Sequence, residues 1–218
     1  MRNAALALQK MIGRGEGLYG LAVATLAVLL SALSGCGGTH HPIKYYQITY
    51  PTPGTMAPDA VDTVLLVRTF DASHLYMDDK IVYGMDSPEM GTYEYQRWVE
   101  PPVEILQDSL VRGLRASGRF KGVYRLRSDV NGQFVLGGRL YDFKEVDGSM
   151  IVARLSYEMR LRDRKTGVTV WNHVYNHDEP ASEKSVTAFV LAMDKNIQRS
   201  VQEMQAGLEE YFRAHPVK

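Results

Sequence analysis

The chain has 218 residues, with 25 basic and 25 acidic side chains and therefore no net formal charge. This length fits one domain or at most two small ones, and 45% hydrophobic and 23% charged residues exclude a disordered chain or a collagen-like fibre. The neutral charge balance argues against a nucleic-acid-binding protein, and a single cysteine excludes a disulfide framework or a cysteine-rich zinc site.

The N-terminal region has the three parts of a secretory signal. Arg2, Lys10 and Arg14 form a basic start, an apolar run without charged side chains covers residues 18–33, and small residues follow. The run is shorter than the ~20 residues that cross a bilayer as a helix. We therefore expect residues 1–35 to be a signal peptide, and an uncleaved membrane anchor is the alternative.

The apolar run ends in the sequence Leu-Ser-Gly-Cys at residues 33–36, which resembles the bacterial lipobox. Small residues let a peptidase approach the backbone, and the thiol of the lipobox cysteine accepts a diacylglyceryl group. We expect Cys36 to be lipidated and residues 36–43 to form a lipidated tether, because several acyl chains, at ~0.8 kcal/mol per buried methylene, give permanent anchoring. The alternative is that Cys36 is an ordinary small residue. By resemblance to Gram-negative sorting rules, Gly37 favours the outer membrane.

Short strands are predicted in the first half of the mature chain. Apolar, β-branched and aromatic residues dominate several runs that are separated by proline, glycine and acidic residues. A continuous apolar run, such as the second one, is typical of a strand buried on both faces. The predicted strands cover residues 44–50, 63–70, 80–85 and 92–99.

A helix is predicted after the proline pair at residues 101–102, because proline is favourable in the first helical turn. Apolar residues recur there at spacings of three and four, which is typical of a helix with one buried face. Gly118 is well placed as a left-handed cap at its end. A short strand over residues 120–126 follows. The apolar positions are Val103, Leu106, Leu110 and Leu114.

Three long strands are predicted over residues 133–146, 150–163 and 168–176. Asp147-Gly148 separates the first two strands, and Lys165-Thr166-Gly167 separates the last two; both are typical of hairpin turns. The middle strand alternates apolar and polar residues, so we expect an antiparallel arrangement with one solvated face. Two glycines at positions 137 and 138 indicate a bulge or a close backbone approach.

A long amphipathic helix is predicted over residues 182–213, since its apolar residues recur at spacings of three and four. Gly207 and the polar residues 194–196 are places where it could bend. Two helices and the predicted strands make an α+β fold with two layers. We expect a mainly antiparallel sheet with both helices packed on one face.

Two histidines have a spacing that would suit a metal site on a helix. His173 and His177 are four residues apart, which places two ligands on one helical face. They fall on a predicted strand, where four residues span ~13 Å. We therefore expect surface or edge histidines and no metal-ligating residues.

Catalytic motifs are also not expected. The sequence Lys165-Thr166-Gly167 is similar to the third motif of penicillin-recognising enzymes, but the mature chain has no Ser-x-x-Lys partner for it. Asp78-Asp79 and Asp86 could supply a carboxylate pair for acid–base chemistry, although they flank a short strand in sequence that is typical of a solvated loop. We expect a protein that is not an enzyme, with no catalytic residues and no cofactor.

Aromatic residues are enriched in the first half of the mature chain. Aromatic side chains favour strands, and they are also over-represented in protein interfaces, where they combine an apolar body with a polar tip. Both interpretations remain open for this cluster. The candidate partner interface consists of Tyr93, Tyr95, Arg97 and Trp98.

The mature chain resembles the ABC-type transport auxiliary lipoprotein component family from Lys44 to Phe212. The order and spacing of eight segments carry the resemblance, which covers the domain that we assign to residues 44–214. One departure is the loop over residues 52–62, which matches nothing in the pattern. The segments are KYYQITY, LLVRTF, KIVYGM, EYQRWVEPPVEILQDSLVRGL, SGRFKGVYR, GRLYDFKEVDG, LRDRKTG and VWNHVY.

The resemblance implies a non-enzymatic periplasmic accessory of a lipid transport system of the MCE-domain or paraquat-inducible type. Its implied partners are an MCE-domain protein, an ABC permease with its ATPase, and the membrane that holds Cys36; a homo-oligomer is also compatible. The alternatives are another outer-membrane assembly or envelope lipoprotein that acts as a binding module, and an envelope hydrolase with an unfamiliar site. Direct lipid binding would require an apolar cavity.

Overall fold

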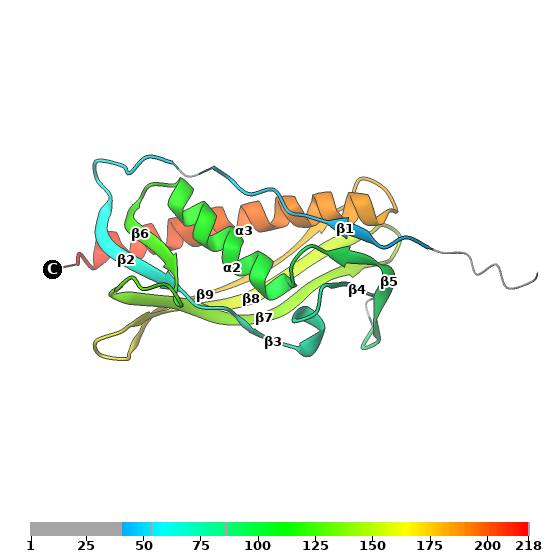
Figure 1. The fold of residues 1–218 in the computed structure, drawn as a ribbon, viewed down its shortest axis with the longest axis horizontal. Coiled ribbons are helices and arrows are strands. Elements are labelled where there is room, and N and C mark those ends of the chain that lie inside the picture. The colour runs from blue at the N-terminus through cyan, green and yellow to red at the C-terminus, as the bar shows by residue number, and fades with distance from the viewer. Residues whose placement is uncertain (1–40, 53, 86, 218) are drawn as a thin grey trace, which may run out of the picture. The chain divides into compact units, whose positions relative to one another are not determined.

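The computed structural model describes residues 41–52, 54–85 and 87–217. The expected signal peptide and Cys36 lie outside these residues. From Ile43 onward the chain forms a compact unit, in which helices α2 (Pro102–Ala116) and α3 (Val186–Ala214) lie on one face of a large sheet (Figure 1). The predicted two-layer α+β fold, with a long C-terminal helix, is confirmed.

Nine strands form one sheet in the described part of the chain, and β7 lies at its centre. The longest ladders are antiparallel and join β7 to β8 and β8 to β9, while the shorter ladders of β1, β2 and β3 are parallel. The strands are β1 (Lys44–Tyr46), β2 (Val61–Val67), β3 (Asp71–Ala72), β4 (Lys80–Gly84), β5 (Met90–Trp98), β6 (Phe120–Arg125), β7 (Phe134–Val146), β8 (Val152–Asp163) and β9 (Thr169–Pro180).

The β7–β8–β9 meander is antiparallel, as the alternation of apolar and polar residues predicted. Every second residue of β8 is buried against the helices, and the intervening residues face solvent. In the turn before β9, the Thr166 amide donates to Asp163 Oδ1 at 2.8 Å, and Gly167 has a φ of 74° that favours glycine. Strand β9 continues to Pro180, beyond the predicted end at residue 176, because Glu179 stays in register with Ala153.

The other edge of β7 pairs in turn with β2, β3 and β4. Leu65 lies opposite Phe134, Asp71 opposite Arg139 and Gly84 opposite Val146. Strand β3 and the short 3₁₀ helix η1 (His74–Tyr76) were not predicted, because two or three residues are too short to show a periodic pattern. This pairing brings segments that are distant in sequence to one strand.

Strand β1 is shorter than the predicted strand over residues 44–50. After Tyr46 the chain leaves the sheet and runs beside α3, where the Thr49 amide donates to Asp194 Oδ1 at 3.2 Å. Ile48 is buried in the core. The predicted strand was too long because residues 47–50 have strand-like side chains, although the backbone leaves the sheet after Tyr46.

Helix α2 agrees with the prediction at both ends. Pro102 is its first residue, and Gly118 follows its end with a φ of 64°. A Cβ at Gly118 would also lie 2.1 Å from the carbonyl oxygen of Thr55, so only glycine fits there. The four apolar positions that predicted the helix are all buried.

Helix α3 begins at Val186, four residues later than predicted, because the Ser185 hydroxyl caps it by accepting from the Ala188 amide at 3.1 Å. The helix is unbroken through both places where a bend was considered. At Gly207, a Cβ would lie 3.0 Å from the ring of Trp171, so the glycine allows close packing on β9. No helix within the described ranges is long and apolar enough to cross a membrane.

Asn196 lies in the middle of α3 and is buried despite its polar side chain. Its Nδ2 donates to the carbonyl oxygens of Ala153 and His177 at 2.8 and 2.9 Å, and its Oδ1 accepts from the Tyr175 hydroxyl at 2.6 Å. A buried amide with its partners satisfied fixes the position of the helix on the sheet. The polar stretch that suggested a bend is therefore a contact between α3 and strands β8 and β9.

For the glycine pair in β7, a bulge or a close backbone approach was predicted, and the structure shows the close approach. A Cβ at Gly138 would lie 1.8 Å from the carbonyl oxygen of Glu158 on β8. The irregularity in the β7–β8 ladder lies slightly further along, between Leu140 and Asp142.

Candidate functional site

Strands β1, β5 and β4 carry a group of aromatic side chains that we call the tyrosine surface. Tyr93, Tyr95 and Arg97 all lie on β5, whose pairing with β4 is irregular between Thr92 and Arg97. Tyr45 on β1 lies in register with Arg97, and the ring of Tyr83 on β4 lies 4.7 Å from that of Tyr93. The surface thus consists of Tyr45, Tyr83, Tyr93, Tyr95 and Arg97.

The rings of the tyrosine surface are accessible to a partner. Tyr45 is 61% exposed, Tyr83 39% and Tyr95 37%. Tyrosine provides a large contact area at a low cost in conformational entropy, and its hydroxyl can form hydrogen bonds at the rim of an interface. The composition of this surface is typical of a protein-binding site.

Trp98, which sequence analysis placed in the same candidate interface, has a different environment. It follows Arg97 directly and therefore points to the other side of β5, where it is 0% exposed. Its ring packs edge-on against Phe143 at 5.4 Å and lies 6.0 Å from Phe189 of α3. Trp98 is a core residue and has no area for contact with a partner.

A buried hydrogen bond fixes the position of the Tyr93 side chain. The Tyr93 hydroxyl donates to Glu145 Oε1 at 2.7 Å, and Glu145 is only 2% exposed. Its other oxygen, Oε2, has no hydrogen-bond partner among the described residues. Burial raises the pKa of Glu145, although the bond from Tyr93 lowers it. Burial, together with this carboxyl group, raises the pKa of Tyr93.

Arg97 is held at the edge of the same surface. Its Nε lies 3.5 Å from Asp79 Oδ1, and its Nη1 donates to the carbonyl oxygen of Tyr93 at 3.3 Å. The largely buried guanidinium therefore links the segment before β4 to β5. Asp79 belongs to the acidic pair that sequence analysis considered and assigned to a loop.

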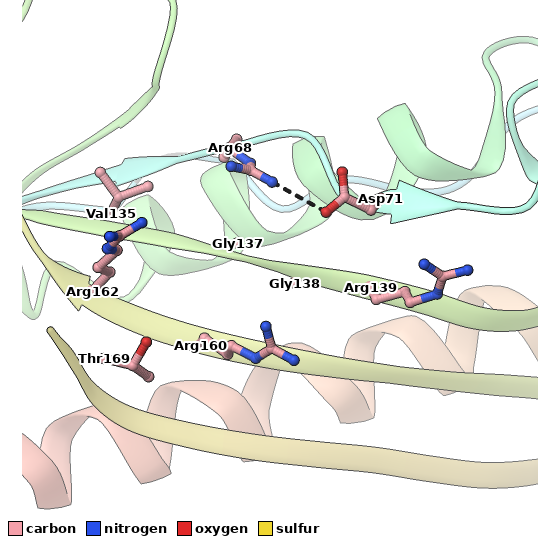
Figure 2. A pocket seen from close by; sticks show the side chains of 9 residues that line it. All are labelled: Arg68, Asp71, Val135, Gly137, Gly138, Arg139, Arg160, Arg162 and Thr169. Carbon is pink, nitrogen blue, oxygen red and sulfur yellow. Dashed lines mark hydrogen bonds and ion pairs between the residues drawn. The ribbon is translucent and has the colours of Figure 1, made fainter. Parts of the chain in front are cut away.

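A second candidate site, which sequence analysis missed, is a hollow on the sheet that we call the arginine hollow. Arg68, Arg139, Arg160 and Arg162 surround the glycine pair of β7 (Figure 2). The hollow measures about 300 Å³. The alternation of Arg160 and Arg162 on the solvated face of β8 is visible in the sequence. Arg68 and Arg139 join them only because β2 and β8 pair with β7.

An apolar hollow of about 350 Å³ lies between α2 and α3, next to residues 49–51. Gly113, Ala116, Ile197 and Val201 provide part of its apolar wall, and glutamines of α3 provide part of its polar wall. It is open to solvent and contains no convergent catalytic groups. Direct lipid binding, the possibility that requires an apolar cavity, could use this hollow.

The two histidines lie on β9 and point to separate partners. His173 Nε2 lies 2.7 Å from Glu203 Oε1, and His177 Nε2 lies 3.2 Å from Glu179 Oε2. Their position on a strand is as predicted. No group of three or more His, Cys, Asp or Glu side chains is arranged to hold a metal ion within the part of the chain that the structure covers.

The fold is shared with solved structures of low sequence identity. A crystal structure of a protein from Xanthomonas campestris is similar with a TM-score of 0.67 and 20% identity, over 76% of this chain and 94% of that chain. An uncharacterized protein is similar with a TM-score of 0.62 and 14% identity, over 77% and 99% of the two chains. At these identities the similarity defines the fold alone.

The sequence itself identifies the family. The model of the ABC-type transport auxiliary lipoprotein component family matches residues 46–205, and the chain belongs to this family. This match confirms the resemblance at the level of the family and makes the chain an auxiliary lipoprotein component of ABC-type transport. No curated protein matches the chain.

Proposed function

We propose that this protein is a non-enzymatic docking component that joins an ABC transport complex to a membrane. Cys36 is its lipid anchor, the outer membrane is its location, and its partners are an MCE-domain protein and the ABC permease with its ATPase. Membership of the auxiliary lipoprotein family supports the accessory role. The exposed tyrosine surface is the observation that carries the docking role.

The tyrosine surface begins close to the proposed anchor along the chain. Seven residues, 37–43, separate Cys36 from the start of β1, and Tyr45 lies within β1. At ~3.4 Å per residue, these seven residues reach at most ~25 Å. A partner bound to Tyr45 and Tyr95 is therefore held close to the membrane surface that carries the acyl chains.

Anchoring makes a modest interface sufficient. When one component is fixed to a membrane, contact with a second component becomes effectively intramolecular, and its effective concentration reaches the millimolar range for short linkers. The exposed aromatic rings then need to provide only moderate intrinsic affinity. This arrangement requires a stable domain and an exposed surface, and it requires no catalytic group.

Site-specific photocrosslinking in intact cells tests this proposal. A benzophenone amino acid would replace Tyr45 or Tyr95, and Tyr141 provides a matched control because it is also an exposed tyrosine but lies on β7. We expect Tyr45 and Tyr95 adducts with an MCE-domain protein or a permease subunit, and no such adduct from Tyr141. Adducts from Tyr141 alone, or none from the three positions, would contradict the proposal.

The identity of the adduct also separates this proposal from the alternative of a different envelope binding module. An adduct of Tyr45 or Tyr95 with an outer-membrane assembly protein would support that alternative. In both cases the tyrosine surface is the contact site. The two functions therefore differ in the partner that mass spectrometry identifies.

A further inference from the structure

Two of the four guanidinium groups in the arginine hollow are already neutralised. Arg68 Nη2 lies 3.1 Å from Asp71 Oδ2, and Arg160 Nε lies 2.6 Å from Glu158 Oε1. Both ion pairs are partly exposed, and each one neutralises the positive charge of one arginine of the hollow.

Arg139 and Arg162 are in a different situation. Arg162 Nε donates to the neutral carbonyl oxygen of Gly167 at 2.6 Å. Neither arginine forms an ion pair with an acidic side chain of the described residues. The hollow therefore has a local excess of about two positive charges, although the whole chain is neutral.

The pairing of the strands places these side chains on one face of the sheet, with Arg162 and Arg139 at opposite ends of the hollow (Figure 2). Gly137 on β7 lies opposite Arg160, Val135 lies opposite Arg162, and Arg139 lies two residues further along β7. Neighbouring strands are ~4.8 Å apart, and residues two apart on a strand are ~6.6 Å apart. Arg139 and Arg162 are thus separated by four residues, or ~13 Å, along the strands, and each side chain has to extend toward Gly137 to contact a common ligand there.

Glycine at position 137 keeps the centre of the hollow open. A Cβ there would lie 3.2 Å from Cβ of Arg68, so a larger side chain would fill the space between the arginines. The side chains of Arg68 and Arg160 lie on opposite sides of the glycine pair (Figure 2). The floor is thus bare backbone, and the walls are cationic.

We propose that the arginine hollow is a binding site for a phosphate group, with Arg139 and Arg162 as its principal ligands. A phosphate monoester has a charge close to −2 at neutral pH, which matches the two guanidinium groups that lack an acidic partner. Guanidinium groups bind phosphate through two parallel hydrogen bonds. Tetrahedral oxygens can accept such pairs from β7 and β8 at the same time. This site is independent of Cys36 and of the tyrosine surface.

The hollow is larger than an isolated phosphate ion and is open to solvent, so the phosphate group can be free or part of a phospholipid headgroup. The shared chemistry is the phosphate group. The two sources differ in size and in charge, because a headgroup diester has one negative charge and additional polar atoms.

Isothermal titration calorimetry of the full chain in a nonionic detergent tests the site. The probes are inorganic phosphate, glycerophosphoglycerol as a deacylated phospholipid headgroup, and a hexaglutamate peptide. We expect a phosphate probe to bind, and the double variant Arg139→Gln/Arg162→Gln to weaken this binding by about tenfold or more, since two charge-assisted contacts are lost.

The matched control is the double variant Lys144→Gln/Arg154→Gln. These cations are opposite each other on β7 and β8, and both form ion pairs, with Asp142 at 2.8 Å and Asp178 at 2.8 Å. The control removes the same charge from the same pair of strands, so we expect affinity to stay within about twofold of the original chain. Circular dichroism would verify that both variants keep their fold.

Each outcome decides the assignment. Tighter binding of inorganic phosphate indicates a free phosphate ligand, and tighter binding of glycerophosphoglycerol indicates a lipid headgroup. Equal affinity in the Arg139→Gln/Arg162→Gln variant and the original chain would overturn the site. Binding of hexaglutamate without binding of either phosphate probe would instead identify the hollow as an interface for an acidic protein segment.

Discussion

Glu145 and Glu179 are two buried carboxylates whose surroundings have opposite effects on stability. Glu145 has one hydrogen bond from Tyr93, and its Oε2 has no partner in the described part of the chain. Glu179 contacts Lys195, lies 3.3 Å from Arg199 and lies 3.2 Å from His177. Burial alone would raise the pKa of Glu179, but these partners lower it.

Glu145→Gln is expected to stabilise the protein at pH 7 by about 1 kcal/mol, because it removes a buried charge that has little compensation and keeps an acceptor for Tyr93. The raised pKa of folded Glu145 means that the folded state binds the proton more tightly than the unfolded chain. The contribution of Glu145 to the free energy of unfolding is therefore lost as the pH rises from the ordinary carboxyl pKa through the raised pKa of the folded state.

Urea unfolding at pH 5 and pH 8 measures this effect. The stability advantage of Glu145→Gln should be larger at pH 8 than at pH 5. An advantage that does not change with pH would show that residue 145 does not titrate differently in the folded and unfolded states.

Glu179→Gln is expected to act in the opposite direction and to destabilise the protein at pH 7 by about 1–2 kcal/mol, since Lys195 and Arg199 lose their acidic partner. Because the pKa of Glu179 is lowered in the folded state, its stabilising effect is fully present at pH values above the ordinary carboxyl pKa. The effect is lost as the pH falls through the pKa of folded Glu179. The same urea measurements at pH 4 and pH 7 test it, and a larger effect at pH 4 would contradict it.

For single residues, the sequence placed Tyr93, Tyr95 and Arg97 on one strand, β5, but it did not show that the register of this strand is irregular between Thr92 and Arg97. It did not show that Trp98 is in the core, since an aromatic residue fits either face of a strand. The arginine hollow could not be predicted, because it depends on pairing between strands that are distant in sequence.

Helices α2 and α3 meet at a point where one of them has no side chain. A Cβ at Gly113 of α2 would lie 2.3 Å from Cγ1 of Val201 on α3. The periodicity of the sequence predicts both helices but not this crossing. Neither helix alone indicates which residue of the other it contacts.

Gly113→Ala is therefore expected to destabilise the protein by about 1–3 kcal/mol, because overpacking at the crossing outweighs the ~1 kcal/mol by which alanine favours a helix over glycine. Thermal unfolding and urea unfolding would measure the change. A stabilised Gly113→Ala variant would contradict close packing at this point.

Val201→Ala provides the control, since it removes the methyl groups that an alanine at position 113 would meet. The double variant should be more stable than the sum of the two single changes predicts, with a coupling energy of about 0.5–3 kcal/mol. If the changes in unfolding free energy of the two single variants simply add, contact with Val201 is not the cause of the Gly113→Ala destabilisation.

Long elements with a clear period were predicted well, and short or interrupted ones were not. Strands β7 and β8 and helix α2 have ends close to those predicted. Strand β9 extends through the polar residues 177–179, because side-chain contacts with α3 and pairing with β8 hold them in the sheet. That information lies in the tertiary structure and not in the local sequence.

For the whole molecule, the family and the two-layer fold followed from the sequence, whereas the arginine hollow followed only from the structure. The family match covers residues 46–205 and does not extend to Cys36. The proposed anchor therefore depends on the lipobox pattern at residues 33–36. A direct test of this residue is informative for the function of the whole chain.

Cys36→Ala is expected to abolish lipidation and to leave either an uncleaved precursor or a protein in the soluble periplasmic fraction. Metabolic labelling with palmitate, followed by membrane fractionation, measures both effects. Ser34→Ala is the control, because it keeps a small residue in the lipobox and should be labelled normally. Palmitate label on the Cys36→Ala protein would exclude this cysteine as the anchor.

The parallel ladder between β2 and β7 has a consequence for how the chain folds. Leu65 of β2 lies opposite Phe134 of β7, with 68 residues between them along the chain. A polypeptide exported with its N-terminus first presents the apolar β2 segment before β7 has crossed the membrane. Such distant contacts form late, and an unpaired apolar strand is prone to aggregation. If the chain is exported in this way, we expect a chaperone that shields the β2 segment until β7 arrives to reduce its aggregation.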